Sequence, residues 1–298
     1  MTTMTAQRQP PAKREPSLMT TIQFLEERLT VGSVMQPMQP ALGMMRAKDL
    51  LALMDENSFD HAAVADHNDV SRYVSRTDLQ VAGNKNVLEC SHIISASNIV
   101  SDTCPLADAL PRIIQNEFLL VLRGKAIDHI VTAADLDRFP VAIYFLSVLH
   151  VFEESLTTKL YALTDAEAQK VLEAWVASIP YQEQSSNEGS KLADSLRSFE
   201  RKKRNRQELR LVNCLHLLHK IQLLQQSQPD WWKLLGCKDA DEASASLGSI
   251  NTLRNSVAHG DAIATSTTGW KEALRTVRAA QRFAERLAGV SEARNLSM

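Results

Sequence analysis

The sequence lacks the patterns that mark several common protein classes. Its four cysteines, Cys90, Cys104, Cys214 and Cys237, stand far apart without a C-x-x-C pair. This argues against a zinc ribbon, a thioredoxin-type redox motif and a disulfide framework, and it fits a reducing, cytoplasmic compartment. Neither G-x-x-x-x-G-K-[ST] nor G-x-G-x-x-G occurs, so nothing points to nucleotide hydrolysis or to a Rossmann dinucleotide site.

Long apolar segments are also scarce. The longest, from Val141 to Phe152, is shorter than the ~20 residues that a bilayer-crossing helix needs, so we expect neither a membrane span nor a membrane partner. The first twenty residues mix Thr, Pro, Gln and basic residues without an apolar core, unlike a signal peptide. We therefore expect a disordered tail or leader at 1–30, and a second tail at 291–298.

What is present indicates a folded protein with two unlike halves. A chain of 298 residues with 44% hydrophobic and 23% charged residues is an ordinary globular composition, and its length favours two domains. Residues 1–180 carry 15 Lys and Arg against 22 Asp and Glu, whereas residues 181–298 carry 18 against 13. The two halves therefore meet different partners.

An internal repeat organises the first half. Residues 61–79 (HAAVADHNDVSRYVSRTDL) align without a gap to residues 118–136 (FLLVLRGKAIDHIVTAADL), at a constant offset of 57 residues. Each copy predicts a strand, a polar turn, a second strand and a helix, and each follows a helical stretch, at 47–56 and at 105–115. The pattern predicts a β-α-β-β-α unit used twice.

Both copies carry a hydroxyl residue and a carboxylate three positions apart, at the start of the last helix. A single Ser/Thr-x-x-Asp is typical of simple helix capping, but its recurrence as Ser75/Asp78 and Thr132/Asp135 favours a functional role. With these motifs the region resembles a pair of CBS domains (cystathionine-β-synthase-type modules). The resemblance implies repeats at about 31–82 and 93–139, with clefts for adenine nucleotides between them.

The resemblance also implies roles for individual residues. In CBS domains the motif carboxylate binds the ribose hydroxyls, and the hydroxyl residue and the helix N-terminus face phosphate. An ionised Asp suits two ribose hydroxyls, and N-terminal amides favour an anion. The nucleotide-binding residues expected on this basis are Ser75, Arg76, Asp78, Thr132 and Asp135, with His129 as a further phosphate contact. The expected ligand is AMP, ADP, ATP or a relative of these.

From about residue 140 the apolar spacing becomes helical throughout. We expect helices at 165–178, with Asp165 as N-cap, at 190–226, at 240–259 and from about 269 to 288. The fold class predicted for the whole chain is an α+β tandem CBS pair followed, over 140–290, by an all-α bundle.

One run in this bundle carries candidate chemistry, namely Arg254, Asn255 and His259. Residues five apart diverge by about 140° in mid-helix, but Gly260 is a natural helix terminator, so His259 lies in the last turn. On spacing alone, a helix-end histidine and a surface arginine explain the run. The run resembles, however, the R-x(4–6)-H signature of HEPN domains, many of which are metal-independent ribonucleases.

That resemblance implies RNA cleavage at a site shared by two chains. His259 would act as general acid or base, Arg254 would stabilise the phosphorane charge, and Asn255 would orient one of them. The expected assembly is a homodimer, and no metal is required.

Two further clusters in the helical half have both a functional and a structural interpretation. A basic stretch can contact the RNA phosphate backbone, or it can form a solvated helix face. The RNA-binding candidates in it are Arg201, Lys202, Lys203, Arg204 and Arg206. Cys214, His216 and His219 can in principle hold a metal, but they lie among leucines, which favours packing, and we expect no metal site.

The two resemblances together predict an adenine-nucleotide sensor joined to a helical effector. The leading hypothesis is a nucleotide-regulated endoribonuclease that is active as a dimer. The alternative is a non-catalytic regulator that uses the helical half for dimerisation or partner docking.

Overall fold

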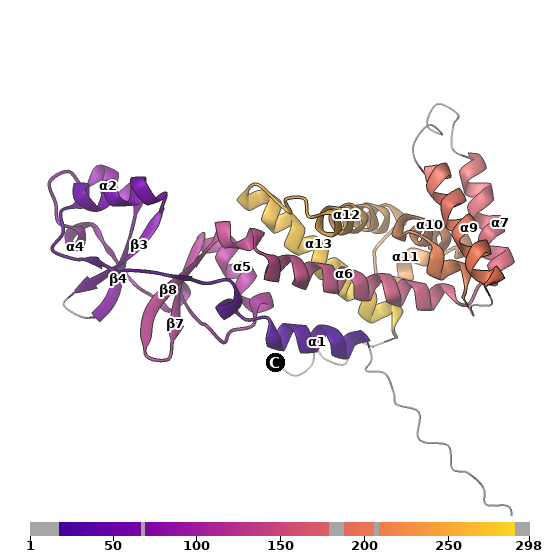
Figure 1. Ribbon diagram of the computed structural model, residues 1–298, viewed down its shortest axis with the longest axis horizontal. Helices are drawn as coiled ribbons and strands as arrows, with labels where there is room; N and C mark the ends of the chain where they lie inside the picture. Colours follow the sequence, from indigo (N-terminus) through magenta and orange to yellow (C-terminus); the bar gives the residue numbers. More distant parts are fainter. Residues whose placement is uncertain (1–17, 67–68, 179–187, 206–208, 290–298) are drawn as a thin grey trace, which may run out of the picture.

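The computed structural model describes residues 18–66, 69–178, 188–205 and 209–289. Residues 1–17 and the tail predicted at 291–298 lie outside this part. The molecule is elongated, with two small sheets and their short helices at one end and long helices at the other (Figure 1). Helix α5 (Leu106–Asn116) contacts α13 (Thr267–Leu287) where the two halves meet. A mixed α+β region is thus followed by a mostly helical one.

The first sheet contains most of the first repeat. Its strand order is β2-β3-β4-β5, with β2 parallel to β3 and the other neighbours antiparallel. Residues 62–64 are buried in succession, as in a strand that is covered on both faces. The elements are β2 (Ala41–Leu42), α2 (Ala47–Asn57), β3 (His61–Asp66), β4 (Asp69–Ser75), α3 (Arg76–Val81), α4 (Val87–Cys90) and β5 (His92–Ile93).

The second sheet repeats this plan in the order β1-β8-β7-β6. A register shift falls at Val64/Ala65 in the first hairpin and at Val121/Leu122 in the second, which confirms the 57-residue offset. The elements are η1 (Val31–Ser33), β1 (Gln36–Pro37), η2 (Ala96–Asn98), β6 (Ile99–Ser101), α5, β7 (Phe118–Arg123), β8 (Ala126–Thr132) and η3 (Ala133–Asp137).

The leading strand of each repeat crosses to the sheet of the other repeat. Strand β1 pairs with β8, where Gln36 lies opposite Ile130, and β5 pairs with β4, where His92 lies opposite Tyr73. Since Tyr73 and Ile130 are equivalent repeat positions, Gln36 and His92 occupy equivalent places in the two sheets. The predicted repeats at 31–82 and 93–139 therefore do not coincide with the two sheets, because each sheet takes one edge strand from the other repeat.

A small apolar core joins the sheets. The rings of His61 and Phe118, which occupy the same position in the two repeats, stack with centroids 4.1 Å apart. Tyr73 lies against Phe118 at 5.1 Å, and Ala63 and Leu120 are fully buried beside it. The repeats are thus packed face to face through their central strands.

The helical half is built around α6 (Phe139–Leu160). This helix contacts α1, α10, α12 and α13, and it runs along the length of the helical half in Figure 1. The remaining elements are α1 (Leu18–Arg28), α7 (Asp165–Ser178), α9 (Glu188–Arg204), η4 (Leu211–Cys214), α10 (Leu217–Ser227), α11 (Trp231–Leu234) and α12 (Ala240–His259).

Helix α6 is longer than the apolar run seen in the sequence. At 22 residues it is the one described helix whose length and composition would allow it to cross a membrane. Its apolar positions, however, form the centre of the large core, with Phe145, Leu149, Phe152 and Leu156 fully buried. Burial against the surrounding helices accounts for its apolar character.

Three sequence expectations in the helical half are corrected. Residues 18–28 of the predicted 1–30 tail form α1, which packs on α6 and carries Glu26, a hydrogen-bond acceptor for Gln281 at 3.4 Å. The single helix expected at 190–226 is divided into α9, η4 and α10. At α7, Thr164 exchanges hydrogen bonds with Glu167 as the cap, and Asp165 instead accepts from the Leu211 amide.

Candidate functional site

The first repeat presents its motif where β4 gives way to α3. Ser75 ends the strand and caps the helix: its Oγ accepts a hydrogen bond from the Asp78 amide at 3.1 Å. Asp78 Oδ2 in turn accepts from the Ser75 amide at 2.9 Å. This reciprocal capping box fixes the direction of the carboxylate.

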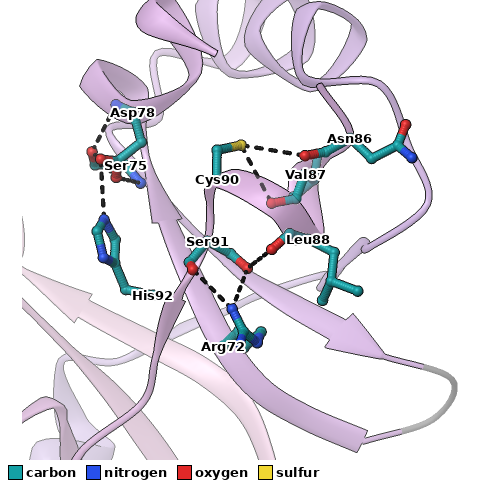
Figure 2. Close-up of polar contacts among 9 residues, drawn as sticks. All are labelled: Arg72, Ser75, Asp78, Asn86, Val87, Leu88, Cys90, Ser91 and His92. Atoms are coloured by element: carbon teal, nitrogen blue, oxygen red, sulfur yellow. Dashed lines mark hydrogen bonds and ion pairs between the residues drawn. The ribbon is translucent and has the colours of Figure 1, made fainter. Parts of the chain in front are cut away.

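The other oxygen of Asp78 meets a side chain from the exchanged strand β5. Its Oδ1 lies 3.1 Å from His92 Nε2, and the two side chains are 27% and 54% exposed. Burial alone would raise the pKa of Asp78, but hydrogen bonds from Ser75 and His92 outweigh it and hold the pKa below its ordinary value. Asp78 is therefore a fixed, ionised and reachable acceptor. Figure 2 shows His92 turned toward the Ser75 and Asp78 pair.

Strand β5 itself is held in place by polar contacts with the first sheet. Arg72 on β4 donates to the Ser91 carbonyl oxygen at 2.9 Å and to its hydroxyl at 3.3 Å (Figure 2). Because Ser91 directly precedes His92, this arginine positions the imidazole beside Asp78.

The second repeat builds the same capping box in a more enclosed place. Asp135 Oδ2 accepts from the Thr132 amide at 2.8 Å and from its hydroxyl at 2.9 Å. Its Oδ1 accepts from Gln36 Nε2 at 3.2 Å and lies 3.0 Å from Arg138 Nε. The Asp135 side chain is only 8% exposed. Both motifs form as the sequence predicts, but the second carboxylate is already satisfied by the protein.

Two side chains expected to contact phosphate are engaged elsewhere. The Arg76 guanidinium binds the end of α2, where it lies 2.8 Å from Asp55 Oδ1 and donates to the Phe59 carbonyl oxygen at 2.7 Å. His129 Nδ1 lies 2.7 Å from Asp128 Oδ1. The Arg76 donors thus hold the repeat together, and its phosphate contact stays a prediction.

In the helical half, α12 ends as the sequence predicts. It stops at His259, and Gly260 adopts the left-handed conformation with φ +73°. His259 and Asn255 are exposed, whereas Arg254 is half-buried. The distance from Arg254 Nη2 to Glu153 Oε2 is 3.5 Å, so the guanidinium is directed toward α6. Arg254 and His259 thus both lie in the last two turns of α12.

The partners of Arg254 were not foreseen from the sequence. Glu153 Oε1 also accepts from Lys220 Nζ at 2.8 Å, and both side chains are nearly buried, at 12% and 5% exposure. A buried charge needs such pairing. The only signals in the sequence were Glu153, which directly follows the apolar run of α6, and Lys220, which lies among the apolar residues of α10.

The basic cluster predicted to bind RNA lies in the last turn of α9. Arg201, Lys203 and Arg204 are exposed, and Lys202 is half-buried. Arg206 lies outside the described residues. Lys203 Nζ stands over the Phe199 ring at 5.4 Å. Consecutive cations circle a helix, and a helix C-terminus stabilises positive charge, so a local structural reason exists for this cluster.

Metal ligands do not gather in the described part of the chain. No group of three or more His, Cys, Asp or Glu side chains there could hold an ion. The rings of His216 and His219 lie 5.8 Å apart, and His219 is buried beside Trp175.

No protein-family model matches the chain, and no curated protein matches it. Several solved structures resemble its N-terminal part. The crystal structure of CBSX2 in complex with AMP is 22% identical over 38% of this chain and 97% of its own, with a TM-score of 0.35. CBSX2 from Arabidopsis thaliana is 23% identical over 38% and 95%, with a TM-score of 0.33.

A third structure is the CBS domain of the bacterial CNNM/CorC family Mg2+ transporter in complex with ATP. It is 18% identical over 40% of this chain and 92% of its own, with a TM-score of 0.33. These neighbours are CBS-domain proteins. The matched share leaves the helical half uncovered.

Proposed function

We propose that the chain is an adenine-nucleotide-sensing regulatory protein, with Ser75 and Asp78 as the centre of its nucleotide site. The observation that carries this proposal is the Asp78 carboxylate, which is fixed by the capping box, ionised by virtue of its lowered pKa and partly exposed. Such a group accepts hydrogen bonds from the two neighbouring hydroxyls of a ribose. The CBS resemblance of the repeat supplies the adenine nucleotide as ligand class.

Removing the ribose hydroxyls from the ligand tests this directly. Calorimetry on the full chain would compare ATP with 2′,3′-dideoxy-ATP, and AMP with ADP. We expect the dideoxy analogue to bind roughly 30-fold or more weakly, because the carboxylate then loses charge-assisted hydrogen bonds. Equal affinity for ATP and its dideoxy analogue, or no binding of any adenine nucleotide, would refute the site.

We further propose that the helical half is a metal-independent endoribonuclease that is active as a homodimer. The favouring observations are an Arg254 guanidinium held by Glu153 and an exposed His259, both near the end of α12. A guanidinium fixed in this way keeps further N–H donors that can meet a phosphate, and the exposed imidazole is accessible to a substrate. The HEPN resemblance implies a site shared by two chains, so a second copy would complete it.

A cleavage assay separates this enzyme from the alternative, a non-catalytic regulator whose helical half dimerises or docks a partner. A mixed RNA pool would be incubated in EDTA, with and without AMP or ATP. Arg254→Lys and His259→Ala should abolish cleavage. His150→Ala, which changes an exposed histidine of α6, is the matched control. If the wild-type protein does not cleave RNA, or if His259→Ala cleaves it equally well, the ribonuclease proposal is refuted. The alternative, a non-catalytic regulator, is then favoured.

Nucleotide binding would control the helical half by changing how two chains pair. Helix α5 of the second repeat contacts α13 of the bundle, so a shift of the repeats acts on the helices directly. A ligand that binds one arrangement more tightly shifts the population toward it.

A further inference from the structure

Helix α13 carries a line of positive charge that neither proposed site uses. Lys271, Arg275, Arg278 and Arg282 are spaced by four, three and four residues, so they share one face of the helix. All four are exposed, whereas the opposite face is buried in the core through Trp270, Val277 and Phe283. We call these four cations the α13 stripe.

The α13 stripe borders a groove at the junction of the two halves. The groove has a volume of about 640 Å³ and lies between α13 and α5. Its apolar lining comes from Pro111, Ile114 and Leu274, and Gln115 adds an amide. None of the lining side chains is acidic. The groove thus combines a cationic edge with an apolar floor.

Only one of the four cations has an ion-pair partner in the described part of the chain. Arg275 Nη2 lies 2.6 Å from Glu272 Oε1 on the same helix, in an exposed pair. Within the described part of the chain, Lys271, Arg278 and Arg282 form no ion pair. Aligned like charges repel one another, so an arrangement of this kind is favourable when an anion lies along it.

The spacing indicates an anion with several charges in a row. At 1.5 Å of rise per residue the cations follow one another by about 6, 4.5 and 6 Å along the helix axis, over about 16 Å in total. A linear array of this length suits successive phosphates of an extended strand, and an apolar floor suits its base or sugar faces. A groove of this volume accepts units of nucleotide size.

We propose that the α13 stripe and the groove between α5 and α13 bind the phosphodiester backbone of single-stranded RNA. The choice of RNA rests on the proposed ribonuclease function. The stripe begins one turn into α13, and only residues 260–266 separate that helix from His259 at the end of α12. RNA lying along the stripe would therefore lead toward the proposed cleavage residues.

Two isolated lysines of the helical half supply a matched control for charge. Arg278→Gln with Arg282→Gln removes two cations from the stripe, and Lys170→Gln with Lys238→Gln removes two exposed cations that belong to neither the stripe nor the α9 cluster. Circular dichroism would verify that both double variants remain folded. Fluorescence anisotropy with a labelled oligouridylate of about twelve nucleotides would measure RNA affinity across roughly 50 to 200 mM salt.

The stripe variant should bind RNA roughly tenfold or more weakly, and its log–log salt slope should fall by about 1.4, since each phosphate contact contributes about 0.7 for a single strand. The Lys170 and Lys238 double variant should stay within about twofold of wild type. An unchanged stripe variant, equal losses in the two variants, or full displacement of RNA by micromolar ATP would overturn the proposal.

His259→Ala keeps this test apart from the test of catalysis. The variant should bind the oligouridylate as wild type does, because His259 is not part of the stripe. If RNA binding requires the stripe but no cleavage is found, the ribonuclease proposal is refuted and the proposal of an RNA-binding groove is supported. If cleavage occurs with the stripe variant as with wild type, the groove proposal fails alone.

Discussion

In the first repeat, Asp78 Oδ1 contacts His92, a side chain that is more than half exposed, and the Asp78 carboxylate itself stays partly exposed. In the second, the corresponding oxygen of Asp135 contacts Gln36 and Arg138, and the Asp135 side chain is almost wholly buried. The capping boxes around both carboxylates are nonetheless the same. Four local residues thus set the direction of the carboxylate, and residues distant in sequence decide whether a ligand can reach it.

The comparison is closest at the exchanged strands. Gln36 and His92 occupy equivalent register positions, and each contacts the motif carboxylate of the sheet that its strand has joined. Arg138, which follows Asp135 by one helical turn, adds a second partner to the buried carboxylate. The first repeat has Val81 at the corresponding position. We therefore expect one strong nucleotide site per chain, in the first repeat.

The largest expected effect is on nucleotide affinity. Asp78→Asn should weaken adenine-nucleotide binding about 100-fold, because two hydrogen bonds to a charged acceptor contribute roughly 1.5 kcal/mol each. Asp135→Asn should change it by less than about threefold. Calorimetry on both variants checks this. Equal losses would mean that the second carboxylate also serves the ligand and that the two repeats do not differ in function.

The next prediction concerns stability, and here the larger effect is expected at Asp135 and the smaller at Asp78. Asp135→Ala should lower the free energy of unfolding by about 3 kcal/mol, because it leaves the Gln36 amide and the Thr132 amide without their buried acceptor. Asp78→Ala should cost about 1 kcal/mol, the usual value of a lost cap in a more exposed place. Urea denaturation followed by circular dichroism measures both. A larger loss for Asp78→Ala would contradict the contrast in burial.

A third prediction concerns Arg76, whose repeat equivalent is Ala133. Arg76→Ala should lower the free energy of unfolding by roughly 1 kcal/mol, because the hydrogen bonds to the end of α2 are lost. Nucleotide affinity should stay within about twofold. The same two measurements apply, with Arg123→Ala as control, since it changes an exposed arginine of β7. A marked loss of nucleotide affinity would instead support the sequence prediction that Arg76 contacts the nucleotide.

The smallest effect is a pH dependence at the stacked pair of His61 and Phe118. Burial lowers the pKa of His61 despite the opposing charges of Asp60, Glu117 and Asp78, so the folded state holds this ring neutral. The unfolded chain takes up the proton more readily, and stability is therefore lost as pH falls below about 6.5.

His61→Phe should remove this component, because phenylalanine keeps the stacked ring but does not titrate. Urea midpoints between about pH 5 and pH 8 would show it. An identical slope in the wild type and in the variant would assign the pH dependence to other groups.

Local patterns predicted what local interactions determine. The 57-residue repeat, the two capping boxes and the end of α12 at Gly260 each depend on residues within one hairpin or one helical turn. The exchange of β1 and β5, the contact between Gln36 and Asp135 and the pairing of Glu153 with Lys220 join residues 67 to 99 positions apart, or strands from different repeats. No periodicity within a window encodes such contacts.

The errors in the helical half have a similar origin. Leucines continue through 190–226, so the apolar pattern predicted one helix, but Arg210 and the Leu211 amide bind Asp165 of α7 and turn the chain there. The same contact removes Asp165 from the cap that it was expected to form. The α13 stripe was overlooked because its cations are spread over 12 residues, whereas those of α9 are contiguous.

The exchange of edge strands also bears on how this protein folds. Neither sheet is complete until the leading segment of the other repeat has arrived, so a chain cut between the repeats would expose an unpaired edge in both sheets. We therefore expect the two repeats to unfold together as one cooperative unit. A destabilising substitution in either repeat should then lower the stability of both repeats.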